Sequence, residues 1–143
     1  MVVLDARGRV LALERTAVAG GWQLPQGGIE GGEEPVDALW RELREETGLT
    51  ADDVHVVAEL PEWLGYELPA EYRSPKTGRG QVHKWFLLRA GTNDLPVRTD
   101  TTADAEFRAW HWVALADLAD QAVGFRQPVY RRLAAFVDGF RSR

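Results

Sequence analysis

Residues 35–47 carry the pattern that most limits how this chain can fold, because apolar side chains recur there at the three- and four-residue spacing of one helix face. These side chains are Val36, Leu39, Trp40 and Leu43. Pro35 suits the first position of a helix, and Gly48 suits the position just after its last residue. We therefore expect a helix over residues 35–47 that buries this apolar face in a hydrophobic core.

A second stripe of the same helix is acidic. Each helical step rotates by about 100 degrees, so Glu42, Glu45 and Glu46 lie at roughly 240, 180 and 280 degrees from the first apolar position. Like charges at i, i+3 and i, i+4 spacing destabilise a helix by about 0.2–0.5 kcal/mol per pair. Converging carboxylate oxygens are the ligands that Mg²⁺ or Mn²⁺ prefers, and a bound cation would turn the repulsion into coordination. The competing interpretation is a solvated acidic face relieved by Arg41 and Arg44.

Further elements follow from hydrophobic periodicity and from turn residues. We predict strands over residues 2–5, 10–15, 54–60, 81–88 and 106–113, a short helix over 114–120 and a C-terminal amphipathic helix marked by Val129, Leu133, Phe136, Val137 and Phe140. Residues 17–32 read mostly as loop, and residues 61–80 as a long loop or loose hairpin. This order of elements predicts an α+β fold with a mixed-sheet sandwich.

Size and composition limit the possible classes of protein. A length of 143 residues and 45% apolar content suit a single domain, residues 1–143, with a packed core. The absence of cysteine excludes disulfides and thiolate metal sites and fits a reducing cytoplasm. The opening MVVLDARGRV does not read as a signal peptide, and no apolar run approaches the roughly 20 residues that cross a bilayer. We expect a cytoplasmic protein without membrane contact.

The net charge of −5 gives no general attraction for nucleic acid. A polyphosphate ligand must therefore be held by local positive groups or by bound cations.

A longer pattern encloses the acidic stripe. Gly27, Glu33 six positions later and the run RELREETGL over residues 41–49, which includes Gly48, fill every fixed position of G-x5-E-x7-R-E-U-x-E-E-x-G-U, where U is apolar. This pattern resembles the signature of the Nudix hydrolases. The resemblance implies an α/β/α sandwich, with a mixed sheet between the signature helix and a C-terminal helix. It also implies Mg²⁺-dependent cleavage of a nucleoside diphosphate linked to another group.

Segments outside the signature are similar to one Nudix branch, the bacterial RNA pyrophosphohydrolases and dinucleoside polyphosphate hydrolases. They are WQLPQGGI at residues 22–29, YELP at 66–69, GQVHKWF at 80–86, and VGFR at 123–126 followed by VYRR at 129–132. The likeness therefore covers nearly the whole chain.

The resemblance assigns roles at the metal site. It implies that Glu42, Glu45 and Glu46 hold Mg²⁺, with Mn²⁺ as a substitute, and that Glu42 is also the base for the attacking water. A backbone carbonyl in the Gly27–Gly28 loop completes the coordination, and Arg41 orients the cluster through Glu33. For Arg41 the alternative is a surface ion pair.

Glu106 matches an acidic residue of the branch that serves as a ligand or as a second base. Its alternative is an ordinary charge at the end of a strand. Spacing does not decide which carboxylate takes the proton.

Substrate contacts are expected from three cations and two aromatic residues. Lys84 and Arg126, with Arg15 as a weaker candidate, are predicted phosphate ligands, and Tyr66 and Phe125 are predicted to contact a base or a phosphate. The alternatives are solvent exposure for Lys84 and core packing for Phe125.

Two departures from the branch bear on the substrate. The branch usually has a Tyr-Arg segment before the first strand, whereas Met1 stands almost at that strand here, and an Arg-Arg pair at the end of the second strand is replaced by Glu14-Arg15. With the net acidity, these departures weaken the case for a long RNA partner. They leave dinucleoside polyphosphates or the 5′-polyphosphate end of RNA as substrates.

Two alternative functions remain open. One is a nucleoside triphosphate or nucleotide-sugar pyrophosphatase. The other is a non-catalytic Nudix-like sensor that binds a nucleotide or RNA. Oligomeric state is not predicted.

Overall fold

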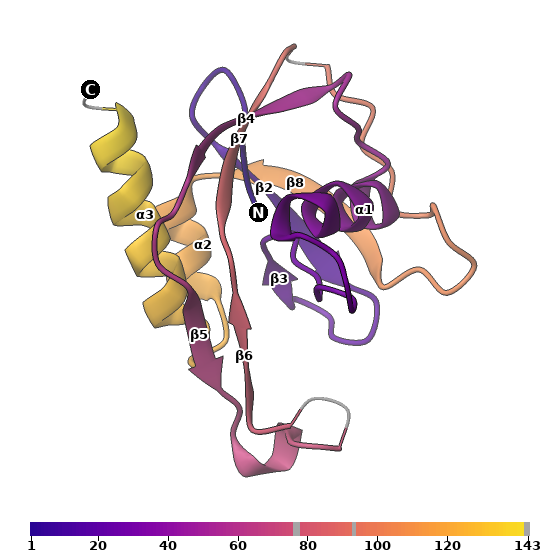
Figure 1. The fold of residues 1–143 in the computed structure, drawn as a ribbon, viewed down its shortest axis with the longest axis vertical. Coiled ribbons are helices and arrows are strands. Elements are labelled where there is room, and N and C mark those ends of the chain that lie inside the picture. The colour runs from indigo at the N-terminus through magenta and orange to yellow at the C-terminus, as the bar shows by residue number, and fades with distance from the viewer. Residues whose placement is uncertain (76–77, 93, 142–143) are drawn as a thin grey trace.

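The computed structural model describes residues 1–75, 78–92 and 94–141, and its centre is a mixed β-sheet (Figure 1). The strands are β1 (Val2–Leu4), β2 (Val10–Arg15), β3 (Trp22–Gln23), β4 (Val54–Glu59), β7 (Phe86–Ala90) and β8 (Phe107–Val113). They are ordered β3-β2-β1-β7-β4, with β8 paired to β2. Strands β1 and β7 are parallel and the other pairs are antiparallel, which confirms the predicted mixed sheet.

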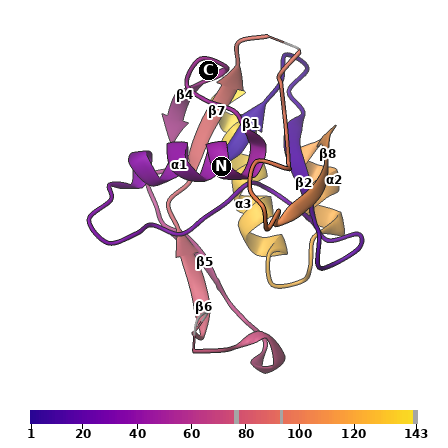
Figure 2. The ribbon, with the colours of Figure 1, turned by 90° about the vertical axis from the view of Figure 1, so that its right-hand side faces the viewer.

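Helices cover both faces of this sheet (Figures 1 and 2). Helix α1 (Pro35–Thr47) lies on one face, and α2 (Leu115–Gln121) and α3 (Gln127–Arg141) lie on the other. Successive side chains of β1 point to opposite faces of the sheet, so this strand contributes to the core on both sides. Val3 packs in the hydrophobic cluster on the α1 side, and Val2 packs in the cluster on the α2 and α3 side. The predicted α/β/α sandwich is therefore confirmed, while the single domain over residues 1–143 stays a prediction.

The two ends of α1 follow the predicted signals. Pro35 occupies the first helical position, and Gly48 ends the helix in the left-handed conformation at φ 73°. The Gly48 N–H donates to the Arg44 carbonyl at 2.9 Å, which closes the last turn.

The predicted buried face of α1 is wrong at one end. Its buried residues are Ala38, Leu39, Leu43, Glu46 and Thr47. Val36 is 41% exposed, whereas Ala38, two residues later, is 4% exposed, so the first turn buries its other side. The buried face of α1 is consequently centred closer to Glu46 than the spacing of its apolar residues predicts.

The predicted loop or loose hairpin over residues 61–80 belongs to a hairpin of β5 (Leu64–Glu67) and β6 (Gly80–His83) that extends three residues past the predicted end, with a short 3₁₀ helix, η1 (Ala70–Tyr72), between the strands. Residues 76 and 77 of that range lie outside the described part of the chain. The hairpin projects from the sandwich in both ribbon views (Figures 1 and 2). It brings side chains from β5 and β6 to the cavity below α1.

Two sequence predictions need correction. The strand predicted over residues 81–88 is two strands, because β6 pairs with β5 in the projecting hairpin, whereas β7 pairs with β1 and β4 in the main sheet. The predicted loop over residues 17–32 contains β3, which two backbone pairs with β2 hold in place.

Within the described residues, none of the helices combines the length and apolar character needed to cross a bilayer.

Candidate active site

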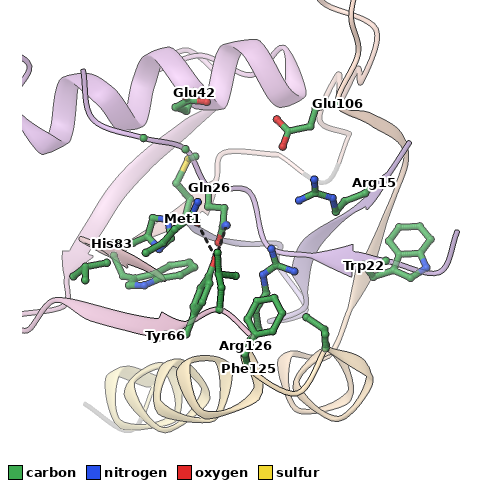
Figure 3. A pocket seen from close by; sticks show the side chains of 18 of the residues that line it. Met1, Arg15, Trp22, Gln26, Glu42, Tyr66, His83, Glu106, Phe125 and Arg126 are labelled. Atoms are coloured by element: carbon green, nitrogen blue, oxygen red, sulfur yellow. Dashed lines mark hydrogen bonds between the residues drawn. The ribbon is translucent and has the colours of Figure 1, made fainter. Parts of the chain in front are cut away.

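A cavity of about 1080 Å³ lies between α1, the loop after β3 and the β5–β6 hairpin. Glu42 reaches it from α1 and Glu106 reaches it from the segment before β8, whereas Tyr66, Phe125 and Arg126 line its other side (Figure 3). One cavity therefore joins part of the predicted metal site to all five of the predicted substrate contacts, since Arg15 and Lys84 also line it.

Arg41 is the hub of the acidic cluster. Its Nε donates to Glu33 Oε2 at 2.8 Å and its Nη2 donates to Glu33 Oε1 at 2.9 Å, a bidentate pair. Its Nη1 donates to Glu42 at 2.7 Å and lies 3.5 Å from Glu45, and Nη2 also donates to the carbonyl of Gly28 at 2.8 Å. With one fifth of its side chain exposed, Arg41 is more than a surface ion pair. It ties α1 to the loop after β3.

Glu46 is the most buried of the three helix carboxylates, at 5% exposure. Its Oε2 accepts a hydrogen bond from the backbone N–H of Gln26 at 3.1 Å. Its Oε1 is buried and has no hydrogen-bond partner among the described residues. Glu42 is half-buried and Glu45 is exposed, so the acidic stripe runs from the surface into the interior.

Burial and mutual repulsion raise the affinity of this cluster for protons. Burial, followed by the charges of Glu106 and Glu42, raises the pKa of Glu46 well above its usual range. Burial also raises the pKa of Glu42, assisted by Glu45 and Glu106 and opposed by Arg41. By contrast, the hydrogen bonds from Arg41 and from the Glu30 N–H lower the pKa of Glu33 to about 2. Glu33 is thus a fixed anion that holds Arg41, while the fold favours the protonated forms of Glu42 and Glu46 unless a cation compensates their charges.

Gly27 lies directly against this cluster. A Cβ atom on Gly27 would overlap the side-chain carboxyl group of Glu42, whereas one on the neighbouring Gly28 would meet no described atom within 4 Å. The requirement for glycine at position 27 therefore comes from the close approach of the loop to Glu42. This proximity places the Gly27 backbone at the predicted metal site.

Glu106 lies on the same side of the cavity as Glu42 (Figure 3). Its backbone carbonyl accepts a hydrogen bond from the Thr16 N–H at 2.9 Å, which fixes the segment before β8. Its charge contributes to the raised pKa of both Glu42 and Glu46, so it belongs to the same electrostatic cluster. The fold brings together residues that are about sixty positions apart in sequence.

Tyr66, Phe125 and Arg126 form one contact group. The rings of Tyr66 and Phe125 are 5.0 Å apart, and the Arg126 guanidinium lies 5.7 Å from the first ring and 5.0 Å from the second. The Tyr66 hydroxyl donates to Gln81 at 2.8 Å and accepts from Gln26 at 3.4 Å. These contacts hold a flat aromatic surface and a cation at the cavity wall.

The two remaining predicted contacts differ in accessibility. Arg15 lines the cavity near Glu106, and its guanidinium donates a long hydrogen bond, 3.4 Å, to Gln23 (Figure 3). The Lys84 ammonium donates to the Pro61 carbonyl at 3.0 Å and pairs with Glu59 at 3.3 Å. Lys84 is therefore engaged by the protein itself, although part of the residue lines the cavity.

Comparison with known proteins identifies the family. The model of the NUDIX domain matches residues 1–133, most of the chain. This chain belongs to the Nudix family. An RNA pyrophosphohydrolase of Saccharophagus degradans is 41% identical over 134 residues, covering 92% of this chain and 79% of that protein. The RNA pyrophosphohydrolase of Acidiphilium cryptum is 48% identical over 117 residues, covering 79% and 69%. The chain is thus a Nudix hydrolase of the branch predicted from its sequence.

Solved structures confirm the Nudix fold. A Caenorhabditis elegans Ap4A hydrolase in a binary complex superposes with a TM-score of 0.71 at 24% identity, covering 96% of this chain and 94% of that one. The dihydroneopterin triphosphate pyrophosphohydrolase of Escherichia coli superposes with a TM-score of 0.69 at 20% identity, covering 94% and 92%. At these identities the likeness establishes the fold alone.

Nudix hydrolases generally require a divalent metal, and the residues of this site fit one. Glu42, Glu46 and Glu106 share an electrostatic cluster, and Glu46 carries a buried oxygen without a partner. Carboxylate oxygens are the donors that hard divalent cations prefer. Within the described residues, however, no three acidic or histidine side chains converge as a preassembled metal site, and Glu42 is bound to Arg41 instead. A metal would have to compete with Arg41 for Glu42.

Sequence reasoning missed three cavity residues of this Nudix domain. Gln26, His83 and Trp85 each line the cavity and each have a buried polar atom without a partner among the described residues. All three lie in segments that resemble the branch, but the resemblance gave them no role. The signal that could have identified them was a polar or amphipathic side chain close in sequence to a predicted site residue.

Proposed function

We propose that this Nudix hydrolase cleaves a phosphoanhydride bond at the 5′-polyphosphate end of RNA, using Mg²⁺ and a water nucleophile. The observation that carries the proposal is the single cavity that Glu42 and Glu106 share with Tyr66, Phe125 and Arg126. Such a cavity suits a ligand with a polyphosphate chain at one end and a base at the other. The curated relatives at 39–48% identity, which are RNA pyrophosphohydrolases, support this substrate class.

The proposed metal ligands are the carboxylates of Glu42, Glu45, Glu46 and Glu106 and the backbone carbonyl of Gly27. Bound Mg²⁺ would neutralise phosphate oxygens and lower the pKa of a coordinated water. Mn²⁺ would substitute, because it prefers the same oxygen donors.

Glu42 is the proposed general base. Its raised pKa makes it a better proton acceptor near neutral pH than an ordinary carboxylate. Arg41 restrains it through the 2.7 Å hydrogen bond and is itself restrained by Glu33. Glu106 is the second candidate for this role, since it faces the same part of the cavity (Figure 3).

The proposed substrate contacts divide between base and phosphate. The paired rings of Tyr66 and Phe125 offer a stacking surface, and base–aromatic stacking contributes about 1–3 kcal/mol per base. Arg126 and Arg15 line the same cavity as cations for phosphate oxygens. Lys84 would join them only by leaving Glu59 and the Pro61 carbonyl.

Dinucleoside polyphosphates are the second candidate substrate class. The net charge of −5 favours a short ligand over a long RNA, because it gives no general attraction for a polyanionic chain. At the end of β2, Glu14 adds an acidic group that is paired with Arg108 at 2.8 Å. The cysteine-free composition fits the cytoplasmic location that we propose for either substrate.

A substrate panel tests the proposal. The protein is incubated with Mg²⁺ and triphosphorylated RNA, diadenosine tetraphosphate, nucleoside triphosphates or nucleotide sugars, and the products are identified. Preferential release of pyrophosphate or phosphate from the RNA end is the expected result. Preference for diadenosine tetraphosphate would select the second candidate, and preference for nucleoside triphosphates or nucleotide sugars would overturn both. Binding without turnover across the panel would indicate a sensor.

A further inference from the structure

Buried polar atoms without partners gather along the active-site cavity. Among the described residues, Gln26 Oε1, His83 Nδ1, Trp85 Nε1 and Arg126 Nε are buried, lack a hydrogen-bond partner and belong to residues that line the cavity. Buried polar side-chain atoms are nearly always hydrogen-bonded, so four such atoms at one cavity indicate a group that completes them.

These atoms belong to side chains that surround Tyr66. The His83 ring lies 6.1 Å from the Tyr66 ring and 6.0 Å from the Trp85 ring, and the Arg126 guanidinium lies 5.7 Å from the Tyr66 ring. Figure 3 shows His83 and Arg126 on the side of the cavity away from Glu42 and Glu106. His83 and Arg126 therefore lie apart from Glu42 and Glu106, whereas Gln26 connects the two sides, because its backbone N–H donates to Glu46.

The hydrogen-bonding capacity of the group determines which ligand it suits. An indole N–H and a guanidinium N–H donate and never accept, and the neutral imidazole of His83 donates from Nδ1 in one of its two tautomers. Arg126 has no carboxylate partner among the described residues, and its contacts are with the faces of Tyr66 and Phe125. Gln26 Oε1 is an acceptor, but the other three atoms offer donors and a positive charge, which match the oxygens of a phosphate.

We propose that His83 Nδ1, Trp85 Nε1 and Arg126 Nε bind one phosphate group of the substrate, at a subsite separate from the acidic cluster of α1. The subsite rests on the proposed function in that it needs a substrate with a polyphosphate chain. It gives His83 and Trp85 a role in substrate binding, and it pairs a donor-rich end of the cavity with an acidic, metal-binding end.

Two substitutions with matched controls test the subsite by kinetics. Trp85→Phe and His83→Phe each remove the polar atom and keep an aromatic ring. The controls are Trp112→Phe, on β8 and outside the cavity lining, and His55→Phe, exposed on β4. Losing a hydrogen bond to a charged group predicts a rise in KM of about tenfold or more in the cavity variants, with kcat nearly unchanged. Equal KM values in cavity variants and controls would overturn the proposal.

A binding measurement on the unmodified protein keeps the test independent of turnover and of the folding of the variants. Inorganic tripolyphosphate is added without metal, and NMR follows the Trp85 indole N–H and the His83 ring. Burial, the Met1 amino group and Arg126 hold the pKa of His83 at about 4, and a bound anion is expected to raise it. Tripolyphosphate should shift the indole resonance and raise that pKa.

Unchanged resonances at saturating tripolyphosphate would contradict the subsite. If the substrate panel fails while both resonances respond, the proposed reaction is wrong and the phosphate subsite stands.

Discussion

Arg41 donates two parallel hydrogen bonds to Glu33, from Nε to Oε2 at 2.8 Å and from Nη2 to Oε1 at 2.9 Å. The same guanidinium contacts Glu42 and the Gly28 carbonyl. A lysine would keep the charge but lose the planar fork, and it would satisfy only some of these acceptors. The geometry of the acidic cluster therefore depends on an arginine at position 41.

Arg41→Lys is expected to lower kcat by about 10- to 100-fold, the usual cost of losing a group that orients metal ligands. Steady-state kinetics at saturating Mg²⁺ measures the loss. Arg44→Lys, exposed on the same helix, is the matched control and should retain activity. Equal activity of the two variants would show that the fork has no role in the reaction.

Gly27→Ala is expected to abolish most activity, because its Cβ would overlap the Glu42 carboxyl group. Gly28→Ala is the matched control, since its Cβ would meet no described atom within 4 Å. We expect a loss in kcat of about 100-fold or more for the first, following the sensitivity of catalysis to a misplacement of about 1 Å. Comparable losses in both variants would point to loop conformation instead of the contact with Glu42.

Glu42→Gln tests the proposed base. Removing a general base lowers kcat by about 10²- to 10⁴-fold, and we expect that loss at saturating Mg²⁺ with little change in Tm. Glu34→Gln, exposed just before the same helix, should leave kcat unchanged. Near-normal turnover by the Glu42 variant would transfer the role to another carboxylate, with Glu106 as the first to examine.

The buried charge of Glu46 predicts an unusual dependence of stability on pH. Because the pKa of Glu46 is raised in the folded state, folding favours the protonated carboxyl. Its contribution to stability is therefore fully present below the unfolded pKa, about 4.3, and is lost as pH rises through the folded pKa.

Glu46→Gln should consequently stabilise the metal-free protein at pH 7 by about 1–3 kcal/mol, because the amide can still accept from the Gln26 N–H and avoids the desolvation penalty of a buried charge. The gain should vanish near pH 4, where the wild-type carboxyl is protonated. Urea unfolding with EDTA at the two pH values measures both differences. If the variant were less stable than the wild type at pH 7, the expected destabilisation by the buried Glu46 carboxylate would be contradicted.

Divalent metal should stabilise the fold by linkage. A ligand at one hundred times its Kd adds about 2.7 kcal/mol, which corresponds to a rise in Tm of about 5–10 °C for a domain of this size. The rise with Mg²⁺ should be larger in the wild type than in Glu46→Gln, and Mn²⁺ should act similarly. A Tm that is indifferent to saturating Mg²⁺ would count against the proposed metal site.

The sequence determined the local features of this protein. Periodicity predicted α1 with its start at Pro35 and its end at Gly48, because helix signals act within a few residues. Helical rotation also predicted that Glu42, Glu45 and Glu46 share one side of α1, and their spacing in the signature indicated the family. These features need no knowledge of what packs against the helix.

Only the tertiary structure decided how those residues are surrounded. Burial of Glu46, exposure of Val36 and the engagement of Lys84 by Glu59 depend on segments distant in sequence, which no local pattern reports. Local patterns likewise do not report that His83 and Trp85 each have a buried polar atom without a partner, since whether an atom is hydrogen-bonded depends on all of its neighbours in the fold. Local spacing fixes which side chains are neighbours on one helix, and long-range packing fixes their solvation, partners and pKa.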